Sequence, residues 1–242
     1  MLITGAARGI GAAIAVAAAP THDLVINFSV SEDAAEQVAE RARAAGANAL
    51  VYCADVGVEA QVVEMFEATD QHFGRLDVLV NNAGIAGGHN RLDVVDAQAL
   101  AALWAVNITG AFVCAREAVR RMSTAHGGSG GSIINISSRA AVIGGSHEWI
   151  HYAASKGAID SMTAGLSKEV AAEGIRVNAV RPGMTLSDFH LHGPPGRVDE
   201  MEPNIPMQRA GMPAEIAAAV VWLASDQASY VTGAFLDVSG GR

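Results

Sequence analysis

The chain of 242 residues is half hydrophobic (50%), only 17% of its residues are charged, and its formal net charge is −9. This balance excludes a disordered protein, and the length fits one large α/β domain, here residues 1–242, with a sizeable buried core. An acidic chain with few aromatic residues (5%) and no Lys/Arg cluster argues against nucleic acid or a membrane surface as a partner.

Cysteine usage and the N-terminus bear on the cellular location. Cys53 and Cys114 lie in apolar surroundings, which predicts reduced core thiols, no disulfide framework and a cytoplasmic protein. No uninterrupted apolar run reaches the ~18 residues of a membrane span. Glycines and Arg8 interrupt the N-terminal segment too early for a signal peptide.

Short β-branched runs alternate with longer alanine-rich runs, a pattern that predicts βαβ units and a parallel sheet. Most of the short runs are apolar throughout, as in strands covered on both faces. The predicted strands are Met1–Thr4, Leu24–Phe28, Ala49–Cys53, Val78–Asn81, Ser132–Ser137, Arg176–Val180 and Ala234–Val238. The predicted helices are Ile10–Ala19, Glu32–Ala45, Glu59–Phe73, Ala97–Met122, Tyr152–Glu173 and Pro213–Ser225.

Two stretches depart from this regular pattern. Only Met1, Leu2 and Ile3 precede the first turn, fewer than the ~5–6 residues of a mean strand, which leaves open whether leading residues of that strand are missing. The long segment Ser187–Gly211 is predicted to be irregular and to act as a substrate lid. It contains an HxH pair, His190 and His192, but no third ligand at a suitable spacing, so we predict no metal site.

A glycine-rich turn follows the first predicted strand and opens the first predicted helix. It reads Gly5-Ala6-Ala7-Arg8-Gly9-Ile10-Gly11. Glycines permit a tight turn, a close approach of the backbone to a pyrophosphate and close helix–strand packing, while the helix N-terminus attracts the phosphates. In this strand–turn–helix context we favour a dinucleotide site over an ordinary glycine turn.

The end of the second strand indicates which dinucleotide binds. NAD is usually held there by a carboxylate on the ribose 2′-hydroxyl, but this chain has Asn27-Phe28-Ser29. Arg8 and Ser29 could instead hold a 2′-phosphate. We therefore favour NADP, with NAD as the alternative.

Tyr152 and Lys156 stand at i and i+4, so they share one helix face. A nearby ammonium could lower a phenol pKa from ~10 far enough for general acid/base catalysis near neutral pH. Ser138 follows a buried strand, where an α/β crevice opens, and could bind a substrate oxygen or simply cap a turn. Asn107 interrupts an apolar helical run; it could bend the helix and hold a water, or be a buried amide bonded to backbone.

These motifs, in this order along nearly the whole chain, resemble the short-chain dehydrogenase/reductase family. The motifs are Thr4-Gly5, Gly9 and Gly11, Asn81-Asn82-Ala83-Gly84, Asn107, Ser138, Tyr152 with Lys156, and Arg181-Pro182-Gly183. Within the family the chain looks most like bacterial 3-oxoacyl-carrier-protein reductases and glucose 1-dehydrogenases. The resemblance implies a single-domain Rossmann fold with a doubly wound seven-stranded parallel sheet in the order 3-2-1-4-5-6-7.

The resemblance also implies residue roles. Tyr152 would be the general acid/base, Lys156 would lower its pKa and bind the nicotinamide ribose, Ser138 would orient the substrate oxygen, and Asn107 would hold a water of a proton relay. The other residues implied to bind the cofactor are Asp55 and Val56 at the adenine, Asn82, Ala83 and Gly84 at the adenosine ribose, and Pro182, Gly183, Thr185 and Ser187 at the nicotinamide.

The predicted function is therefore NADP(H)-dependent interconversion of a carbonyl and a secondary alcohol, which are the small-molecule substrates. Two alternatives stay open: an NAD-dependent alcohol or sugar dehydrogenase of the same family, and a protein that senses the nucleotide without chemistry. The resemblance implies a homotetramer, or else a homodimer, with Ala97–Met122 and Tyr152–Glu173 at an interface.

Overall fold

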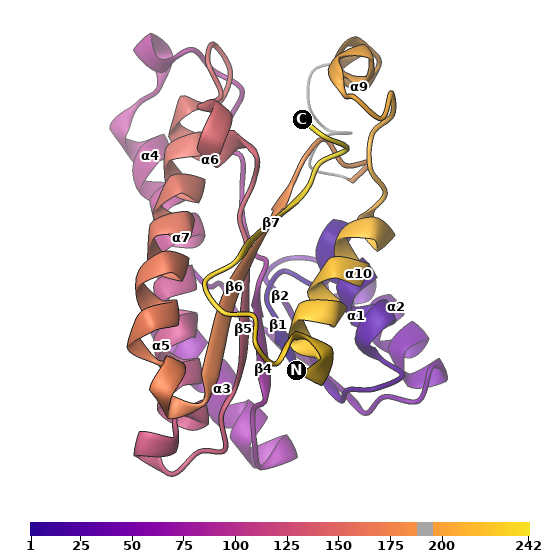
Figure 1. The fold of residues 1–242 in the computed structure, drawn as a ribbon, viewed down its shortest axis with the longest axis vertical. Helices are drawn as coiled ribbons and strands as arrows, with labels where there is room; N and C mark the ends of the chain where they lie inside the picture. The colour runs from indigo at the N-terminus through magenta and orange to yellow at the C-terminus, as the bar shows by residue number, and fades with distance from the viewer. Residues whose placement is uncertain (188–195) are drawn as a thin grey trace.

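Seven parallel strands form one sheet in the order β3-β2-β1-β4-β5-β6-β7, and helices cover both of its faces (Figure 1). This computed structural model describes residues 1–187 and 196–242. The strands are β1 (Leu2–Ile3), β2 (Leu24–Phe28), β3 (Ala49–Cys53), β4 (Val78–Asn81), β5 (Gly131–Ile136), β6 (Ile175–Pro182) and β7 (Phe235–Val238). The predicted fold class and strand order are confirmed.

The helices form the two outer layers of the molecule. One face of the sheet carries α1 (Gly9–Ala18), α2 (Glu32–Ala44) and α10 (Pro213–Ala224), on the right in Figure 1. The other face carries α3 (Glu59–Phe73), α4 (Ala97–Trp104), α5 (Ala111–Met122) and α7 (Ile150–Glu169). Two short helices, α6 (Ala140–Ile143) and α9 (Arg197–Met201), lie at the upper end in that view.

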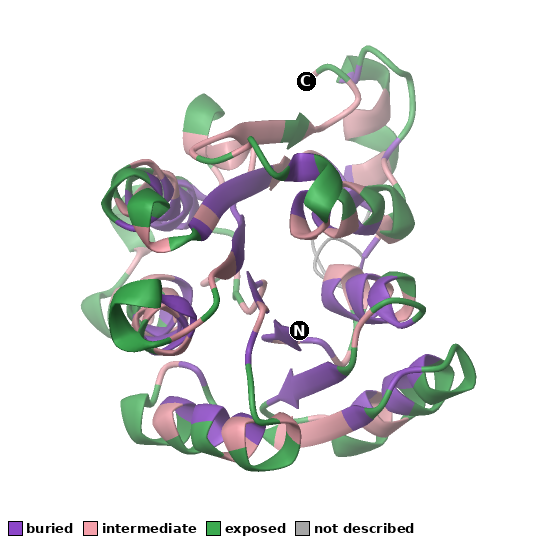
Figure 2. Ribbon diagram, turned by 60° about the horizontal axis from the view of Figure 1, so that its bottom comes forward, coloured by how far each residue is buried: buried purple, intermediate pink, exposed green. Residues whose placement is uncertain are grey.

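The sheet is built from strands whose successive residues are apolar on both faces. In β1, Leu2 packs into the hydrophobic cluster beneath α3 and α5, whereas Ile3 packs into the cluster beneath α1 and α10. Leu79 and Val80 of β4 divide in the same way. Figure 2 shows these strands buried between helices whose outer faces are exposed. A strand buried on both faces needs side chains of this kind at every position, which is why β1 is stable with two residues between β2 and β4.

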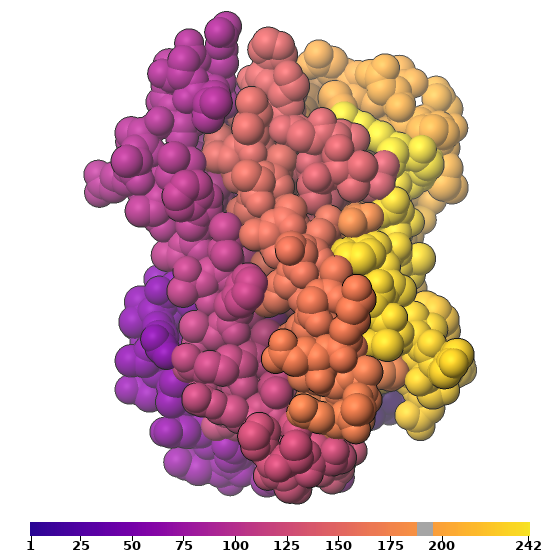
Figure 3. All heavy atoms as spheres, turned by 60° about the vertical axis from the view of Figure 1, so that its left-hand side comes forward, coloured from indigo at the N-terminus to yellow at the C-terminus, as the bar shows by residue number. Residues whose placement is uncertain are grey.

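The predicted helix Ala97–Met122 is divided into α4, a π-helical segment over Ala105–Gly110, and α5. By length and composition alone this run could cross a membrane, because an 18-residue stretch of it has a mean hydropathy of 1.5, contrary to the expectation that no apolar run would be long enough. Core helices of globular proteins pass the same test, and α5 packs its Val113, Cys114 and Ala118 into the sheet cluster. Figure 3 shows the face of the molecule on which α5 and α7 lie side by side.

The predicted irregular segment Ser187–Gly211 is partly helical, because α9 and a 3₁₀ turn (Glu202–Asn204) occupy it. Its base is closed by backbone bonds, in which Leu186 N donates to Gly211 O (2.8 Å) and Gly211 N to Met184 O (2.9 Å). A small apolar cluster of Met184, Ile205 and Ala210 lies beneath α9. His190 and His192 lie outside the described residues.

The two cysteines are free, as predicted, but only one is a core thiol. Cys114 is buried, and burial raises its pKa to about 12. Cys53 is exposed because it is the last residue of β3, the outermost strand at one side of the sheet, so the expectation that it is a core residue was wrong.

Candidate functional site

A cleft of about 720 Å³ opens at the carboxyl ends of the strands. Residues that immediately follow strands line it, among them Gly5 after β1, Ser29 after β2, Asn82 after β4 and Ser137 after β5. Open α/β sheets bind their ligands at this edge, outside the ends of the strands. All but two of the predicted site residues line the cleft; the exceptions are Phe28 and Asn107.

The glycine turn forms one end of the cleft. Its backbone conformation and close contacts disfavour side chains at the three glycines. Gly5 and Gly9 have φ of 62° and 55°, in the left-handed region that favours glycine. A Cβ on Gly11 would lie 2.5 Å from Gly5 O and 2.6 Å from Asn82 Nδ2. Arg8 is the extended residue before α1, and Ile10 is in the first turn of that helix. The turn therefore presents the free amides of a helix N-terminus to the cleft, a geometry that suits a pyrophosphate.

The end of the second strand holds the glycine turn in place through the side chain of Asn27. Asn27 is 1% exposed, its Oδ1 accepts from Gly5 N (3.0 Å), and its Nδ2 donates to Ala54 O (2.9 Å). Phe28 packs into the hydrophobic core, so its side chain does not reach the cleft as predicted for a cofactor contact. Ser29 and Arg8 are exposed and line the cleft.

The predicted adenine and ribose side is held together by backbone and side-chain bonds. Asp55 lines the cleft, and its Oδ1 accepts from Gly57 N at 2.8 Å. Val56 lies beside it at 6% exposure. Asn82 Nδ2 donates to the main-chain oxygens of Thr4 (2.8 Å) and Gly5 (3.0 Å), which joins the loop after β4 to the glycine turn. Ala83 and Gly84 continue that loop along the cleft wall.

Tyr152 and Lys156 meet on one face of α7, as the spacing predicts. The Lys156 ammonium lies 5.7 Å from the centre of the Tyr152 ring and donates to Ile136 O at 2.8 Å. Both residues are buried, at 9% and 4% exposure. Burial raises the pKa of Tyr152 to about 12, and its hydrogen bond with Ser138 opposes that rise. Burial lowers the pKa of Lys156 to about 8, and the charge of Asp160 opposes that fall.

These directions differ from the sequence expectation that Lys156 lowers the Tyr152 pKa. The cause is desolvation, which penalises the charged form of each group and dominates both pKa values in the protein alone. Ser138 is the group that does favour the phenolate. The three residues nevertheless stand together, with the phenol and the serine hydroxyl facing the cleft.

Asn107 lies behind this group, in the π-helical segment. It is 1% exposed, its Oδ1 accepts from Ile85 N (2.8 Å), and its Nδ2 donates to Ile85 O (2.9 Å) and Ser155 Oγ (3.1 Å). The helix departs from regular α-helical geometry at Asn107, as a π-helical segment, and the Asn107 amide makes the backbone bonds of the structural alternative. A Cβ on Gly84 would lie 3.4 Å from Asn107 Oδ1 and 3.5 Å from Lys156 Nζ, so these two groups flank that glycine.

A buried polar chain beneath the site was not predicted. Ser137 Oγ donates to Asp160 Oδ1 (2.6 Å), and Arg181 binds the other oxygen of Asp160 at 2.8 Å. Asp160 stands four residues after Lys156 on α7, so the same i, i+4 reasoning that paired Tyr152 with Lys156 could have found it. This chain fixes the start of the segment after β5 against α7.

The remaining predicted residues form the wall opposite Tyr152. Pro182, Gly183, Thr185 and Ser187 all line the cleft. A Cβ on Gly183 would lie 2.8 Å from Ser239 Cα, which explains why this position lacks a side chain. Thr185 is 1% exposed and donates to Gly183 O at 3.2 Å, so its hydroxyl already has a backbone partner. Ser187 approaches the glycine turn, since a Cβ on Gly9 would be 3.5 Å from Ser187 Cβ.

The sequence predicts that the stretch 147–151 borders the substrate and that Met184 could line its pocket, and Glu148, Trp149 and Met184 do line the cleft. Five residues at the Tyr152 end were missed by sequence reasoning: Arg139, Ala140, Ile143, Arg197 and Arg242. They come from segments far apart in the chain, and no local spacing signals that they meet. Among the described residues, no three His, Cys, Asp or Glu side chains are grouped as a metal site would require.

Comparison with known proteins places this geometry in a family. A family model described as enoyl-(acyl carrier protein) reductase matches residues 5–242. The chain is 49% identical to the uncharacterized oxidoreductase YgfF of Escherichia coli, over all of this chain and 98% of that protein. It is 39% identical to versicolorin reductase 1 of Aspergillus parasiticus (99% and 94% covered) and 36% identical to the 3-oxoacyl-[acyl-carrier-protein] reductase FabG of Staphylococcus epidermidis (99% and 97% covered).

A solved structure agrees with these sequence matches. A short-chain dehydrogenase/reductase from Mycobacterium marinum superposes with a TM-score of 0.93 at 32% identity, over 99% of this chain and 93% of that one. Sequence identity above 30% along the full chain shows membership of the same family, and not only a similar fold. The chain therefore belongs to the short-chain dehydrogenase/reductase family and is an oxidoreductase of the kind that uses a nicotinamide cofactor.

Proposed function

We propose that this protein is an NADP(H)-dependent oxidoreductase that interconverts a carbonyl and a secondary alcohol by hydride transfer, with Tyr152 as general acid/base. The observation that carries the proposal is the buried Tyr152 phenol, hydrogen-bonded with Ser138 and packed on Lys156, at one end of a cleft whose other end is the glycine turn. When bound, the nicotinamide supplies or accepts the hydride.

The residues of the chain supply position and the proton. Tyr152 gives its proton to the carbonyl oxygen during reduction and takes it from the alcohol during oxidation. Ser138 shares a hydrogen bond with that phenol and orients the same substrate oxygen. Lys156, held by Ile136 O, places a positive charge beneath the phenol. The glycine turn would hold the pyrophosphate through backbone amides, which fits a chain whose net charge is −9.

The test is a panel of carbonyl substrates with purified protein and NADPH, followed by the loss of reduced-nicotinamide absorbance. The panel covers sugars, 3-oxoacyl thioesters, small diketones and cyclic ketones. We expect NADPH consumption with at least one class. Measured cofactor affinity without turnover across the whole panel, in either direction, would instead support a nucleotide sensor.

The choice of NADP over NAD is supported by the end of β2. No carboxylate follows that strand, and the exposed Ser29 and Arg8 line the cleft there. Arg8→Ala is expected to raise the Kd for NADPH about 10- to 150-fold and to leave the Kd for NADH nearly unchanged, because a charge-assisted contact is worth about 1.5–3 kcal/mol. Titration of each cofactor by fluorescence measures both values.

Arg75→Ala is the matched control for this measurement. Arg75 is exposed and pairs with Asp77 before β4, at the opposite edge of the sheet from the cleft. Its loss should change neither affinity. An equal loss of NADH and NADPH affinity in Arg8→Ala would show that Arg8 does not bind a 2′-phosphate.

We also propose a cytoplasmic homo-oligomer, a homotetramer or a homodimer. Large apolar side chains are exposed on α5 and just before the π-helical segment, where Phe112 is 48% and Trp104 43% exposed. These helices form the face seen in Figure 3, where α5 and α7 lie side by side. A second copy of the chain would remove this apolar surface from water.

A further inference from the structure

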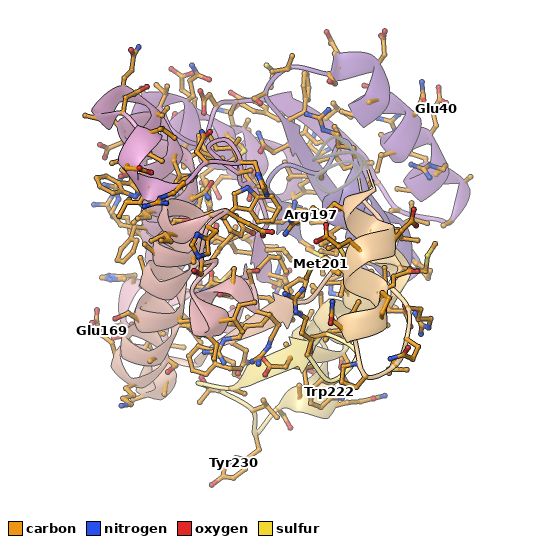
Figure 4. The ribbon with its side chains drawn as sticks, turned by 90° about the horizontal axis from the view of Figure 1, so that it is seen from above. Glu40, Glu169, Arg197, Met201, Trp222 and Tyr230 are labelled. Atoms are coloured by element: carbon orange, nitrogen blue, oxygen red, sulfur yellow. The ribbon has the colours of Figure 1, made fainter. Side chains whose placement is uncertain are left out.

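A cluster of charged groups at the Tyr152 end of the cleft has no part in hydride or proton transfer. Arg197, at the start of α9, is 8% exposed and makes two bonds to Glu148, from Nη1 to Oε1 (2.6 Å) and from Nη2 to Oε2 (2.5 Å). Its guanidinium stacks on Trp149 at 4.3 Å from the ring centre. Figure 4, viewed from above, shows Arg197 on the side of α9 that faces α7.

The Nε–H donor of this guanidinium is unused within the described chain. Arg197 Nε is buried, and no described residue accepts a hydrogen bond from it. A buried donor without a partner costs about 1–3 kcal/mol, so such groups usually meet a ligand or an ordered water. The bonds from Nη1 and Nη2 to Glu148, together with Trp149, fix the plane of the guanidinium and so fix where Nε points.

Arg242 adds a positive charge to the same place. Its side chain lines the cleft with Arg197 and Glu148 and has no acidic partner within 4 Å among the described residues. Burial, and after it the charge of Arg197, lowers the pKa of Arg242, while Glu148 raises it, so the three groups lie close enough to interact. The main-chain oxygen of Arg242 accepts from Arg139 Nε (2.7 Å) and Ser239 Oγ (2.9 Å), which holds the residue in place.

Two of the arginines around the cluster have a carboxylate partner. Glu148 pairs with Arg197, and Asp237 pairs with Arg139 at 2.6 Å, whereas the guanidinium of Arg242 has no Asp or Glu side chain within 4 Å among the described residues. His89 Nε2 lies 3.8 Å from Glu148 and 3.3 Å from Arg197 Nη1. Asp55, the other carboxylate on the described cleft wall, lies at the adenosine side. The Arg242 guanidinium is therefore available to an anion at this end of the cleft.

The cluster is next to the reacting group rather than at the predicted phosphate turn. Trp149 is in ring contact with Tyr152, with centroids 6.0 Å apart, and the Arg197 guanidinium stacks on the same Trp149 ring. A small substrate whose carbonyl lies at Tyr152 and Ser138 would thus extend toward Arg197 and Arg242. The cofactor phosphates are expected at the other end of the cleft, on the turn from Gly5 to Gly11.

We propose that the substrate is a carbonyl compound that carries an oxyanion, a carboxylate or a phosphate, bound by the Arg242 guanidinium with Arg197 Nε as a second donor. The inference rests on the proposed function, because it names the substrate class of the same site. In this arrangement Glu148 and Trp149 are positioning residues that hold Arg197 in its orientation.

The experiment compares matched probes with and without the anion. One set contains oxo acids of increasing length between the carbonyl and the carboxylate, each beside its methyl ester; the other pairs dihydroxyacetone phosphate with dihydroxyacetone. Binding to the protein–NADPH complex is followed by NADPH fluorescence, and turnover by NADPH absorbance. We expect one anionic probe to bind at least about tenfold more tightly than its neutral partner.

Three variants locate the site of that preference. Arg242→Gln should raise the Kd and KM of the preferred anion about 10- to 100-fold with little change in kcat, and should leave the neutral probe unaffected. Arg197→Lys keeps a cation beside Glu148 but removes the Nε donor, and should lose part of the preference. Arg209→Gln, an exposed arginine that pairs with Glu215 outside the cleft wall, should retain all of it.

The outcomes separate this inference from the proposed function. Equal binding of anionic and neutral probes by the natural protein, or an anion preference that survives in Arg242→Gln, overturns the anion site. Tight anion binding without any turnover would leave the anion site standing and count against the proposed reaction. The two probe sets show whether a carboxylate or a phosphate is preferred.

Discussion

Tyr152→Phe is expected to lower the rate of carbonyl reduction by a factor of about 100 to 10,000, the usual contribution of a positioned acid or base. The substitution removes the phenol oxygen and keeps the ring, so the contacts of that ring with Trp149 and the Lys156 ammonium remain. Cofactor affinity, measured by NADPH fluorescence, should stay within about tenfold, since one neutral hydrogen bond contributes about 0.5–1.5 kcal/mol at most.

The pH dependence provides a second check on the same residue. Burial holds the proton on Tyr152, with a pKa raised to about 12, so at neutral pH the side chain is a proton donor suited to reduction. Oxidation of the alcohol needs the phenolate, and its rate should therefore rise with pH across the alkaline range. Turnover that is unchanged in Tyr152→Phe, or a rise of oxidation with pH that persists in the variant, would exclude Tyr152 as the acid/base.

Much of the fold could be predicted because parallel strands that are buried on both faces are short, continuously apolar runs in the sequence. Adjacent apolar residues such as Leu2 with Ile3 and Leu79 with Val80 serve opposite faces of the sheet, so the strands stand out as short apolar runs. The end of α3 is equally local, because Gly74, which follows it, has a φ of 72°, a conformation that favours glycine.

The parts of the site that were missed depend on contacts between distant segments. Tyr152 and Lys156 are four residues apart, and their pairing is fixed by helix geometry. Glu148 and Arg197 are 49 residues apart, and they meet only because the fold places the start of α9 beside the residues that precede α7. Phe28 differs from its neighbours for a local reason: it stands in the run at the end of β2 from which a cofactor contact is predicted, but the alternation of the strand turns its side chain into the core.

Lys156→Met is expected to abolish most of the turnover and, at neutral pH, to stabilise the fold. The ammonium is 4% exposed, and burial lowers its pKa to about 8 from the ordinary value of 10.5. A shift of this size corresponds to about 3 kcal/mol of unfavourable free energy in the folded state at neutral pH. The loss of the hydrogen bond to Ile136 O offsets about 1 kcal/mol of the gain. Thermal unfolding at pH 7 should therefore show a Tm higher on the order of 5 °C.

The sign of the pH dependence distinguishes this explanation from general repacking. Between pH 8 and 10.5 the unfolded chain carries the Lys156 proton and the folded chain does not, so the stability of the natural protein rises with pH across that window. The advantage of Lys156→Met should consequently shrink from pH 8 toward pH 10.5. Lys168→Met is the matched control, because this exposed lysine lies on the same helix and its loss removes no buried charge. An advantage that is constant with pH, or equal in the two variants, would mean that the buried ammonium does not destabilise the fold. The pairing of lost activity with gained stability would show that α7 holds Lys156 charged in the core at a cost in stability, for the sake of the reaction at Tyr152.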